Sequence, residues 1–513
     1  MEIHAVVGSL ATQRAAAIGL GLFADGGVVS GEAAELDARS GGLIRGVLER
    51  GDFSGKEGEE LVLYLPPAAR AGRAILIGLG KAEGFTLEKV REASARLAAA
   101  AARLKVPQLA LSIPGRQRLI AGIGEAAQAA VEGMLLGTYG FRELKTKAEE
   151  NGAAHLTARL LWQDGDTLPT FERGLEAGRK IAAAVCFARD LVARPSNLLT
   201  PTTLAECARQ VAAAHGLRCT VLEKPQLQEL GFGALLGVAR GSAEPPTLSI
   251  LEYRGGEPEA APIVVIGKGI TFDSGGISLK TAENMERMKY DMAGAAATLA
   301  ILKAVASLGL RLNIVGLLPA TENLPGATAY KPGDILRSLS GKTIEVVNTD
   351  AEGRLILADA LAYAQRFSPA AMIDLATLTG ACRIAVGPLA IAMMGNHRAL
   401  RERCEAAAAL SGERVWHLPL WDEYFELIKS DVADVKNSGG APAGTITAGL
   451  FLRQFVGEVP WLHLDIASTA WVDEARPYVP KGPSGAGVRL VAQLLRTWAA
   501  HPAAAVQALR AGV

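Results

Sequence analysis

The stretch Ile263-Val-Val-Ile-Gly-Lys-Gly-Ile-Thr-Phe-Asp-Ser-Gly-Gly-Ile-Ser-Leu-Lys280 joins an apolar run to a glycine-rich loop that carries charge. Its first four residues have the uninterrupted apolar character of a parallel strand that is buried on both faces. The loop that follows contains Lys268, Asp273 and Lys280. Charged side chains directly after a buried strand lie at its carboxyl end, where open α/β sheets place their ligand sites. The stretch therefore predicts an α/β fold with a polar site at one edge of the sheet.

The same alternation of strands and helices continues along the chain. Strand-like apolar runs occupy 312–318, 344–347 and 371–375, and helix-period apolar residues fill 291–305, 355–366 and 443–455. Strands that alternate with helices are typical of a mostly parallel sheet that helices cover. We expect this helix-covered central sheet to form a larger, C-terminal catalytic domain.

A smaller α/β domain is predicted to precede it. Strand-like runs at 60–65 and 74–77 are followed by a helical block at 87–104, and a polar stretch at 163–169 then interrupts the pattern before one long helix from Phe171 to Val192. A chain of 513 residues also exceeds one ordinary hydrophobic core. We predict an N-terminal α/β domain at 1–165, a linker helix at 166–190 and a catalytic domain at 191–513.

Composition argues against several classes of protein. Lys plus Arg and Asp plus Glu number 53 each, so no global field favours nucleic acid or an anionic membrane. The cysteines are odd in number, widely spaced and without a CxxC pair, which fits reduced thiols. The chain opens without a basic region and contains no run of about 18 uncharged apolar residues. We expect a cytoplasmic protein without a membrane span.

Two further clusters place carboxylates at predicted helix starts. Asp291 lies in Met288-Lys-Tyr-Asp-Met-Ala-Gly-Ala295, where a helix of small residues begins. Asp350 and Glu352 lie in Asn348-Thr-Asp-Ala-Glu-Gly-Arg-Leu355, just before an apolar helix. Each acid alone would fit a helix cap or a first-turn charge.

The joint pattern points to metal chemistry. Hard divalent ions require several oxygen ligands, and two ions about 3.5–4 Å apart require bridging carboxylates. The three segments together supply Asp273, Asp291, Asp350 and Glu352. We interpret these four acids as the inventory of a dinuclear site. Two other residues are weaker candidates for catalysis. Ser274 has no GxSxG elbow and no obvious histidine partner, as a serine nucleophile would require, and His463 lies in an apolar run that predicts a core residue.

As spelled, these motifs resemble the leucyl aminopeptidase family of metallopeptidases. The octapeptide 348–355 is the most specific of them, and the likeness extends over roughly 185–500. The resemblance implies that a metal-activated water releases the first residue of peptides with a free amino terminus. It also implies two divalent ions, Mn²⁺ or Zn²⁺, held by Lys268, Asp273, Asp291, Asp350 and Glu352. A lysine ligand must be neutral, which two adjacent dications favour.

The resemblance assigns further roles around the metals. Lys280 matches the lysine that polarises the scissile carbonyl and stabilises the oxyanion. Arg354 matches the arginine that holds a bicarbonate ion as general base. The pocket for the first side chain corresponds to Met288, Thr377, Gly380, Ala467 and Ala470. Such small and apolar groups favour leucine and other apolar residues, with broad selectivity.

Assembly and alternative functions rest on the same resemblance. It implies a homohexamer whose sites face an interior cavity. Ala441 stands where many relatives have an arginine in a glycine-rich loop, so a subunit contact at that position is not carried over. DNA binding through the first domain is the alternative function, which the neutral net charge disfavours. A scaffold without activity is disfavoured because every expected ligand is present. The natural peptides stay open, as does the choice among Mn²⁺, Zn²⁺, Mg²⁺ and Co²⁺.

Overall fold

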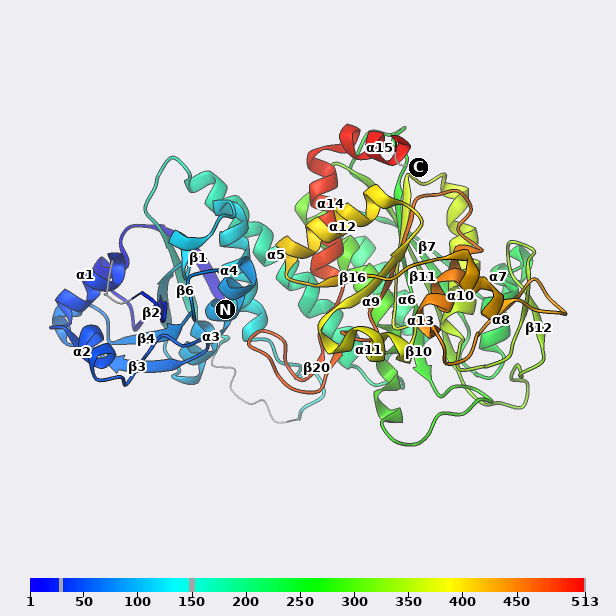
Figure 1. Cartoon of the computed structure of the whole chain (residues 1–513), viewed down its shortest axis with the longest axis horizontal. Helices are drawn as coiled ribbons and strands as arrows, with labels where there is room; N and C mark the ends of the chain where they lie inside the picture. Colours follow the sequence, from blue (N-terminus) through cyan, green and yellow to red (C-terminus); the bar gives the residue numbers. More distant parts are fainter. Residues whose placement is uncertain (27–30, 147–152, 512–513) are drawn as a thin grey trace. The chain divides into compact units, whose positions relative to one another are not determined.

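The computed structural model describes residues 1–26, 31–146 and 153–511 (Figure 1). Strand β9 (Ile263–Gly267) lies near the centre of its nine-stranded sheet. The chain divides into two units: Met1–Ala183 with Glu474–Lys481, and Ala184–Asp473 with Gly482–Val513. Helix α5 (Leu168–Ala193) runs from the first unit into the second. The short segment 474–481 belongs to the first unit although its neighbours on both sides belong to the second.

The first unit contains a six-stranded sheet. Its strand order is β1 (Glu2–Val7), β6 (Thr157–Trp162), β5 (Gln108–Ser112), β2 (Ala17–Leu22), β4 (Arg73–Gly78) and β3 (Glu60–Tyr64), and only β3 is antiparallel to its neighbour. Helices α3 (Leu87–Arg103) and α4 (Ile123–Gly137) pack against each other. Helices α1 (Gly31–Arg39) and α2 (Leu43–Glu49) contribute Leu36, Ile44 and Val47 to a hydrophobic cluster that also contains Ile18 and Leu76 of the sheet. The unit is a small α/β fold, as predicted.

The second unit is built on the nine-stranded sheet. Its order is β16 (Val415–His417), β15 (Ile391–Gly395), β18 (Trp461–Asp465), β14 (Ala371–Ala376), β9, β11 (Asn313–Asn323), β8 (Thr247–Arg254) and β7 (Arg218–Leu222), with β10 (Gly269–Asp273) also paired to β11. Strands β18, β14, β9 and β11 are parallel, and antiparallel pairs lie toward the edges. The sheet is mixed but mostly parallel, which confirms the predicted architecture.

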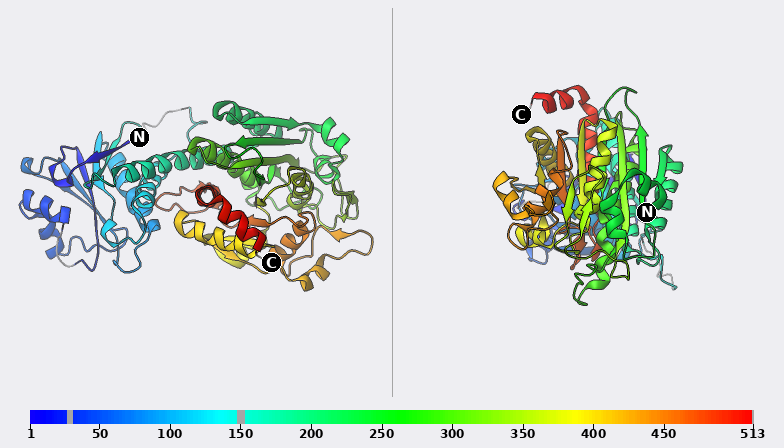
Figure 2. Two further views of the ribbon diagram at one scale, coloured as in Figure 1. Left: turned by 90° about the horizontal axis from the view of Figure 1, so that it is seen from above. Right: turned by 90° about the vertical axis from the view of Figure 1, so that its right-hand side faces the viewer.

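Helices cover both faces of this sheet (Figure 2). One group is α6 (Pro201–His215), α9 (Ala293–Leu308), α12 (Arg398–Ser411) and α14 (Val488–Ala500), and the other is α8 (Gly233–Ala239), α10 (Gly353–Ala364) and α13 (Gly444–Arg453). The double cover explains why Ile263–Ile266 are all buried. Burying a Val or Ile side chain contributes about 1.5–3 kcal/mol, so this strand anchors the loop that follows it.

One helical segment among the described residues, Met285–Leu308, is long and apolar enough to cross a membrane. Its most apolar window is 78% buried inside the protein. It comprises a 3₁₀ turn (Met285–Met292) and α9, which packs against β9, β11 and β14. Its apolar character is therefore that of a core helix.

The run 344–347 departs from the prediction that it belongs to the central sheet. Strand β13 (Thr343–Glu345) lies in a separate three-stranded sheet with β12 (Ile335–Arg337) and β17 (Val435–Lys436). The reason is visible in the burial pattern: Ile344 and Val346 are buried, whereas Val347 is exposed. That alternation is typical of a strand with one buried face. The remaining elements are α7 (Lys224–Leu230), α11 (Gly380–Val386), α15 (Pro502–Ala511) and the paired β19 (Trp471–Val472) and β20 (Gly482–Pro483).

Candidate active site

The charged residues of three distant segments line one cavity of about 420 Å³ in the second unit. Twelve residues were predicted as site residues from the sequence, and ten of them line this cavity: Lys268, Asp273, Lys280, Met288, Asp291, Asp350, Glu352, Thr377, Gly380 and Ala467. Arg354 and Ala470 are buried and are not among the lining residues. The lining also includes residues that the sequence analysis did not name: Thr281, Glu283, Asn284, Met285, Tyr290, Leu378, Thr379 and Arg383.

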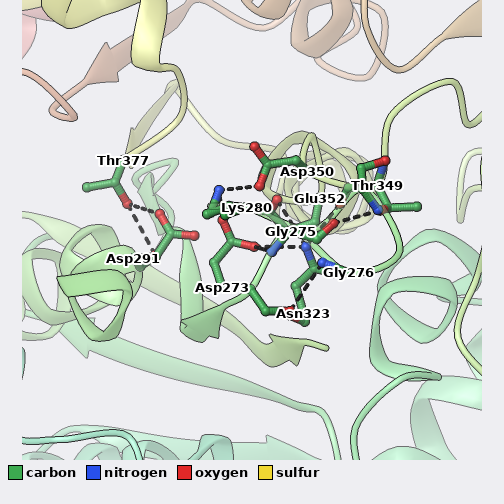
Figure 3. Close-up of polar contacts among 12 residues, drawn as sticks. Asp273, Gly275, Gly276, Lys280, Asp291, Asn323, Thr349, Asp350, Glu352 and Thr377 are labelled. Atoms are coloured by element: carbon green, nitrogen blue, oxygen red, sulfur yellow. Dashed lines mark hydrogen bonds and ion pairs between the residues drawn. The ribbon is translucent and has the colours of Figure 1, made fainter. Parts of the chain in front are cut away.

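Three carboxylates form the tightest part of the site (Figure 3). Asp273, Asp350 and Glu352 each offer an oxygen, and these oxygens lie within 4.8 Å of one another. Asp273 ends β10, and Glu352 is the N-cap residue of α10. Burial and the charge of Glu352 raise the pKa of Asp273 to about 6. A concentration of buried oxygen ligands that repel one another fits a divalent cation, which would remove the repulsion.

Two lysines supply the counter-charge. Lys268 Nζ lies 2.8 Å from both Asp291 Oδ2 and Glu352 Oε1. Lys280 Nζ lies 2.7 Å from Asp273 Oδ2 and also pairs with Asp350. Burial alone would lower the pKa of each lysine, but the surrounding carboxylates outweigh it and hold both pKa values above the ordinary lysine value. Lys268 can become a neutral ligand only where metal charge replaces the charge of its proton.

The neighbours of Lys268 fix its position. Its Nζ donates to the backbone oxygen of Thr377 at 2.7 Å, and Thr377 Oγ1 donates to Asp291 Oδ1 at 2.7 Å. Gly353 leaves the space that the lysine occupies, because a Cβ at this position would lie 2.5 Å from Lys268 Cε and 2.6 Å from Nζ. The glycine of the 348–355 motif is therefore a steric requirement of the site.

Asn323 connects two of the carboxylates. This residue ends β11 and is fully buried. Its Nδ2 donates to Asp273 Oδ1 at 2.8 Å and to the backbone oxygen of Thr349 at 3.0 Å, and lies 3.4 Å from Glu352 Oε2. Asn323 was not among the predicted site residues, because the predicted strand ended at residue 318. The available signal was a polar residue at the carboxyl end of a core strand.

Replacing Asn323 with leucine is expected to weaken Mn²⁺ binding by about 10–100-fold, because residues that orient metal ligands affect affinity by this much. Isothermal titration calorimetry with Mn²⁺ measures the change. Asn313→Ala is the control, since Asn313 begins the same strand and donates instead to Glu257 and Ala260 oxygens. Equal Mn²⁺ affinity in Asn323→Leu and wild type would contradict a role for Asn323 at the metal site.

Arg354 is the second buried cation close to the carboxylates. Burial lowers the pKa of Arg354 to about 10, so its guanidinium remains charged at neutral pH. Its guanidinium makes no hydrogen bond or ion pair with the residues that the structure describes, although the negative charges of Glu352 and Asp465 favour its charged form. A guanidinium presents a fork of donors that matches carboxylate-like anions. Arg354 therefore has donor capacity for a small anion.

Oxygen ligands for a metal and a fixed ammonium group in one strand-end cavity are the parts that hydrolases use to activate water and to stabilise an oxyanion. The architecture and the site together define a metal-dependent hydrolase.

Comparisons with known proteins narrow this class. Residues 186–492 match the catalytic-domain model of the cytosol aminopeptidase family, and residues 18–148 match its N-terminal-domain model. The chain belongs to the cytosol aminopeptidase family. The "Probable cytosol aminopeptidase" of Geotalea uraniireducens (strain Rf4) is 50% identical over 463 residues, which covers 90% of this chain and 93% of that protein. A protein of the same name from Nitrosococcus oceani is 41% identical over 496 residues, with 96% and 98% covered.

Solved structures agree with this membership. A tomato leucine aminopeptidase mutant superposes with a TM-score of 0.86 at 31% identity and covers 97% of this chain and 96% of its own. The bottromycin maturation enzyme BotP in complex with Mn superposes with a TM-score of 0.82 at 35% identity, covering 94% and 100%. The protein is a metal-dependent aminopeptidase, a hydrolase that acts at the amino terminus of its substrates.

Proposed function

We propose that the protein is a di-metal aminopeptidase that releases leucine and other apolar residues from the free amino end of peptides. The observation that carries the proposal is the single cavity that brings Lys268 and four carboxylates beside small and apolar wall residues. The charged residues and the small or apolar residues of this cavity come from segments as far apart in the sequence as Lys268 and Ala467. Their convergence supports one site in which chemistry and side-chain recognition are adjacent.

In this proposal Lys268, Asp273, Asp291, Asp350 and Glu352 would hold two divalent ions: Asp273 and Glu352 would be shared, Asp350 would belong to one ion, and Lys268 with Asp291 to the other. The close approach of Asp273, Asp350 and Glu352 oxygens supports a common cation site. Mn²⁺ or Zn²⁺ would serve, and the Mn in BotP supports the former. When bound, the ions supply an activated water and polarise the peptide carbonyl.

The chain itself supplies the remaining roles. The carboxylates around Lys280 raise its pKa and so favour its protonated form, whose Nζ can donate to the oxygen that becomes negative as the peptide carbonyl is attacked. Arg354 would hold a bicarbonate ion through its guanidinium, and this anion would supply general-base chemistry when bound. The buried, unpaired position of Arg354 among the described residues supports anion binding.

The first side chain of the substrate would lie against Met288, Thr377, Gly380 and Ala467. Ala470, which the resemblance also assigns to this pocket, is buried and does not line the cavity. A Cβ at Gly380 would meet no atom within 4 Å, which leaves room for a branched aliphatic group. Apolar walls discriminate by only about 1–3 kcal/mol per methylene, so selectivity should be broad.

We also infer a cytoplasmic homohexamer. Exposed apolar side chains on the second unit support association: Ile384 is 89% exposed, Leu389 56% and Trp416 67%. Leu389 and Trp416 line a second, mostly apolar hollow of about 590 Å³. Apolar surface of this kind is typical of protein interfaces.

Metal removal is expected to abolish hydrolysis of Leu-p-nitroanilide, and restored Mn²⁺ or Zn²⁺ should recover it. The N-acetylated substrate should not be cleaved, because acetylation turns the amine into an amide whose nitrogen cannot bind a metal. Release of p-nitroaniline measures both effects. Cleavage of the acetylated substrate, or full activity in metal-free protein, would contradict the proposal.

A further inference from the structure

Asp465 joins two walls of the cavity, and the proposed mechanism gives it no role. It is the last residue of β18 and is fully buried. Its Oδ1 accepts hydrogen bonds from the backbone N–H groups of Leu378 and Ala467, each at 3.1 Å. Its Oδ2 accepts one from Thr379 Oγ1 at 2.7 Å. The three donors all belong to residues that line the cavity.

The hydrogen bond from Thr379 also connects Asp465 to the start of helix α11. Thr379 is the N-cap residue of that helix, and its Oγ1 accepts a hydrogen bond from Cys382 N at 3.1 Å. The same hydroxyl lies 2.9 Å from Thr445 Oγ1. Helix α11 begins with Gly380, which also lines the cavity. One carboxylate thus holds the loop 378–380 on one side and the turn at Ala467 on the other.

We propose that Asp465 is a positioning residue that sets selectivity for the first side chain of the substrate by fixing the spacing between these two walls. The inference rests on the proposed function, because it takes this cavity to be the place of that side chain. A carboxylate is suited to the task, since its two oxygens accept three hydrogen bonds from segments that are otherwise separate. Buried donors that lose such an acceptor move to find another partner.

Thr377, which precedes this loop and lies next to the proposed metal ligands, is held by other hydrogen bonds. Thr377 donates to Asp291, and its backbone oxygen accepts from Lys268. Neither contact involves Asp465. Loss of the Asp465 carboxylate should therefore relax the wall of the pocket while the metal ligands keep their positions.

The test compares the Mn²⁺-loaded full-length enzyme with Asp465→Ala and Asp465→Asn. The readout is the ratio of kcat/KM for Leu-p-nitroanilide to kcat/KM for Ala-p-nitroanilide, which does not depend on the fraction of active enzyme. In Asp465→Ala the ratio should fall by about tenfold or more, mainly through a higher KM for the leucine substrate. In Asp465→Asn the ratio should stay within about threefold of wild type, because the amide can accept both N–H groups and donate to Thr379 Oγ1.

Asp359→Ala is the matched control. Asp359 is also fully buried and accepts hydrogen bonds from the backbone N–H groups of Ala234, Leu235 and Leu339, none of which lines the cavity. This variant should lower Tm and leave the leucine-to-alanine ratio unchanged. Mn²⁺ affinity, measured by calorimetry, should be unchanged in Asp465→Ala.

Several outcomes would overturn the inference. One is an unchanged ratio in Asp465→Ala, and another is an equal loss of selectivity in Asp359→Ala. Loss of Mn²⁺ binding in Asp465→Ala would instead assign Asp465 to the integrity of the metal site. If Asp465→Ala does not fold, Thr379→Val replaces it, because this change removes the hydroxyl and keeps the side-chain shape; an unchanged ratio there counts against the inference. Wild-type enzyme without activity would contradict the proposed function, not the role of Asp465.

Discussion

Replacing Glu352 with glutamine is expected to lower kcat/KM for Leu-p-nitroanilide by at least about a thousandfold. Glu352 is one of the three carboxylates that lie closest together, and its Oε1 is 2.8 Å from Lys268 Nζ. Its negative charge therefore acts on both proposed ion positions. Glutamine keeps the volume but removes the negative charge from the position proposed to bridge two ions. Losing several kcal/mol of metal-based stabilisation, about 4 kcal/mol or more, corresponds to this factor. Steady-state kinetics with saturating Mn²⁺ measures it.

Glu345→Gln is the control for this change. Glu345 lies on β13, accepts a hydrogen bond from Ser430 Oγ at 2.5 Å and does not line the cavity. It should retain wild-type kcat/KM. A Glu352→Gln enzyme with activity within tenfold of wild type would show that Glu352 does not bridge the metals.

Replacing Lys280 with methionine is expected to lower kcat by about 10²–10³-fold, the usual loss when one oxyanion donor is removed. Mn²⁺ binding should be retained or strengthened. The reason is that Lys280 Nζ competes with a metal for the carboxylates of Asp273 and Asp350, with which it pairs in this structure. Kinetics and calorimetry on the same preparation separate the two effects.

Lys331→Met serves as the matched control, because the Lys331 side chain is 61% exposed and pairs only with Asp334 among the ion pairs of the described residues. It should leave both kcat and Mn²⁺ affinity unchanged. If Lys280→Met lost Mn²⁺ binding while Lys331→Met did not, Lys280 would be a metal ligand and its role as an oxyanion donor would be wrong.

The fold of the second unit was largely predictable because its central strands are buried on both faces. Ile263–Ile266 is apolar without interruption, 371–375 is apolar except for Asp374, and both form central strands. The run 344–347 is also apolar except for one acid, Glu345, but it has one buried face and belongs to a small separate sheet. A short apolar run does not reveal how many of its faces are covered. Nor could periodicity show that 474–481 returns to the first unit, since that depends on contacts distant in sequence.

The part of the site that could be predicted consists of charged residues that follow a buried strand. Lys268 follows β9, Asp273 ends β10, a strand that the sequence prediction gave as loop, and Lys280 lies beyond it. Charge at such positions is costly unless it is used, and all three residues line the cavity. His463 is fully buried with Nδ1 2.5 Å from Asp374 Oδ1, which confirms the predicted core position. Asn323 and Asp465 were not predicted because most of their partners are distant in sequence. The partners of Asn323 lie 26–50 residues away along the chain. Those of Asp465 lie 86 and 87 residues away, except for Ala467. A single sequence carries no record of such pairings.

Two glycines in this site differ in whether a side chain could replace their hydrogen atom. At Gly353 a single methyl group would collide with Lys268, so inactivation can arise there without the loss of any charged group. At Gly380 a new side chain would enter open space beside the proposed position of the substrate. Substitutions that survive selection should therefore accumulate on the side of the cavity proposed to meet the substrate and be purged from the side proposed to hold the metals. Engineers seeking a narrower substrate range should begin at Gly380.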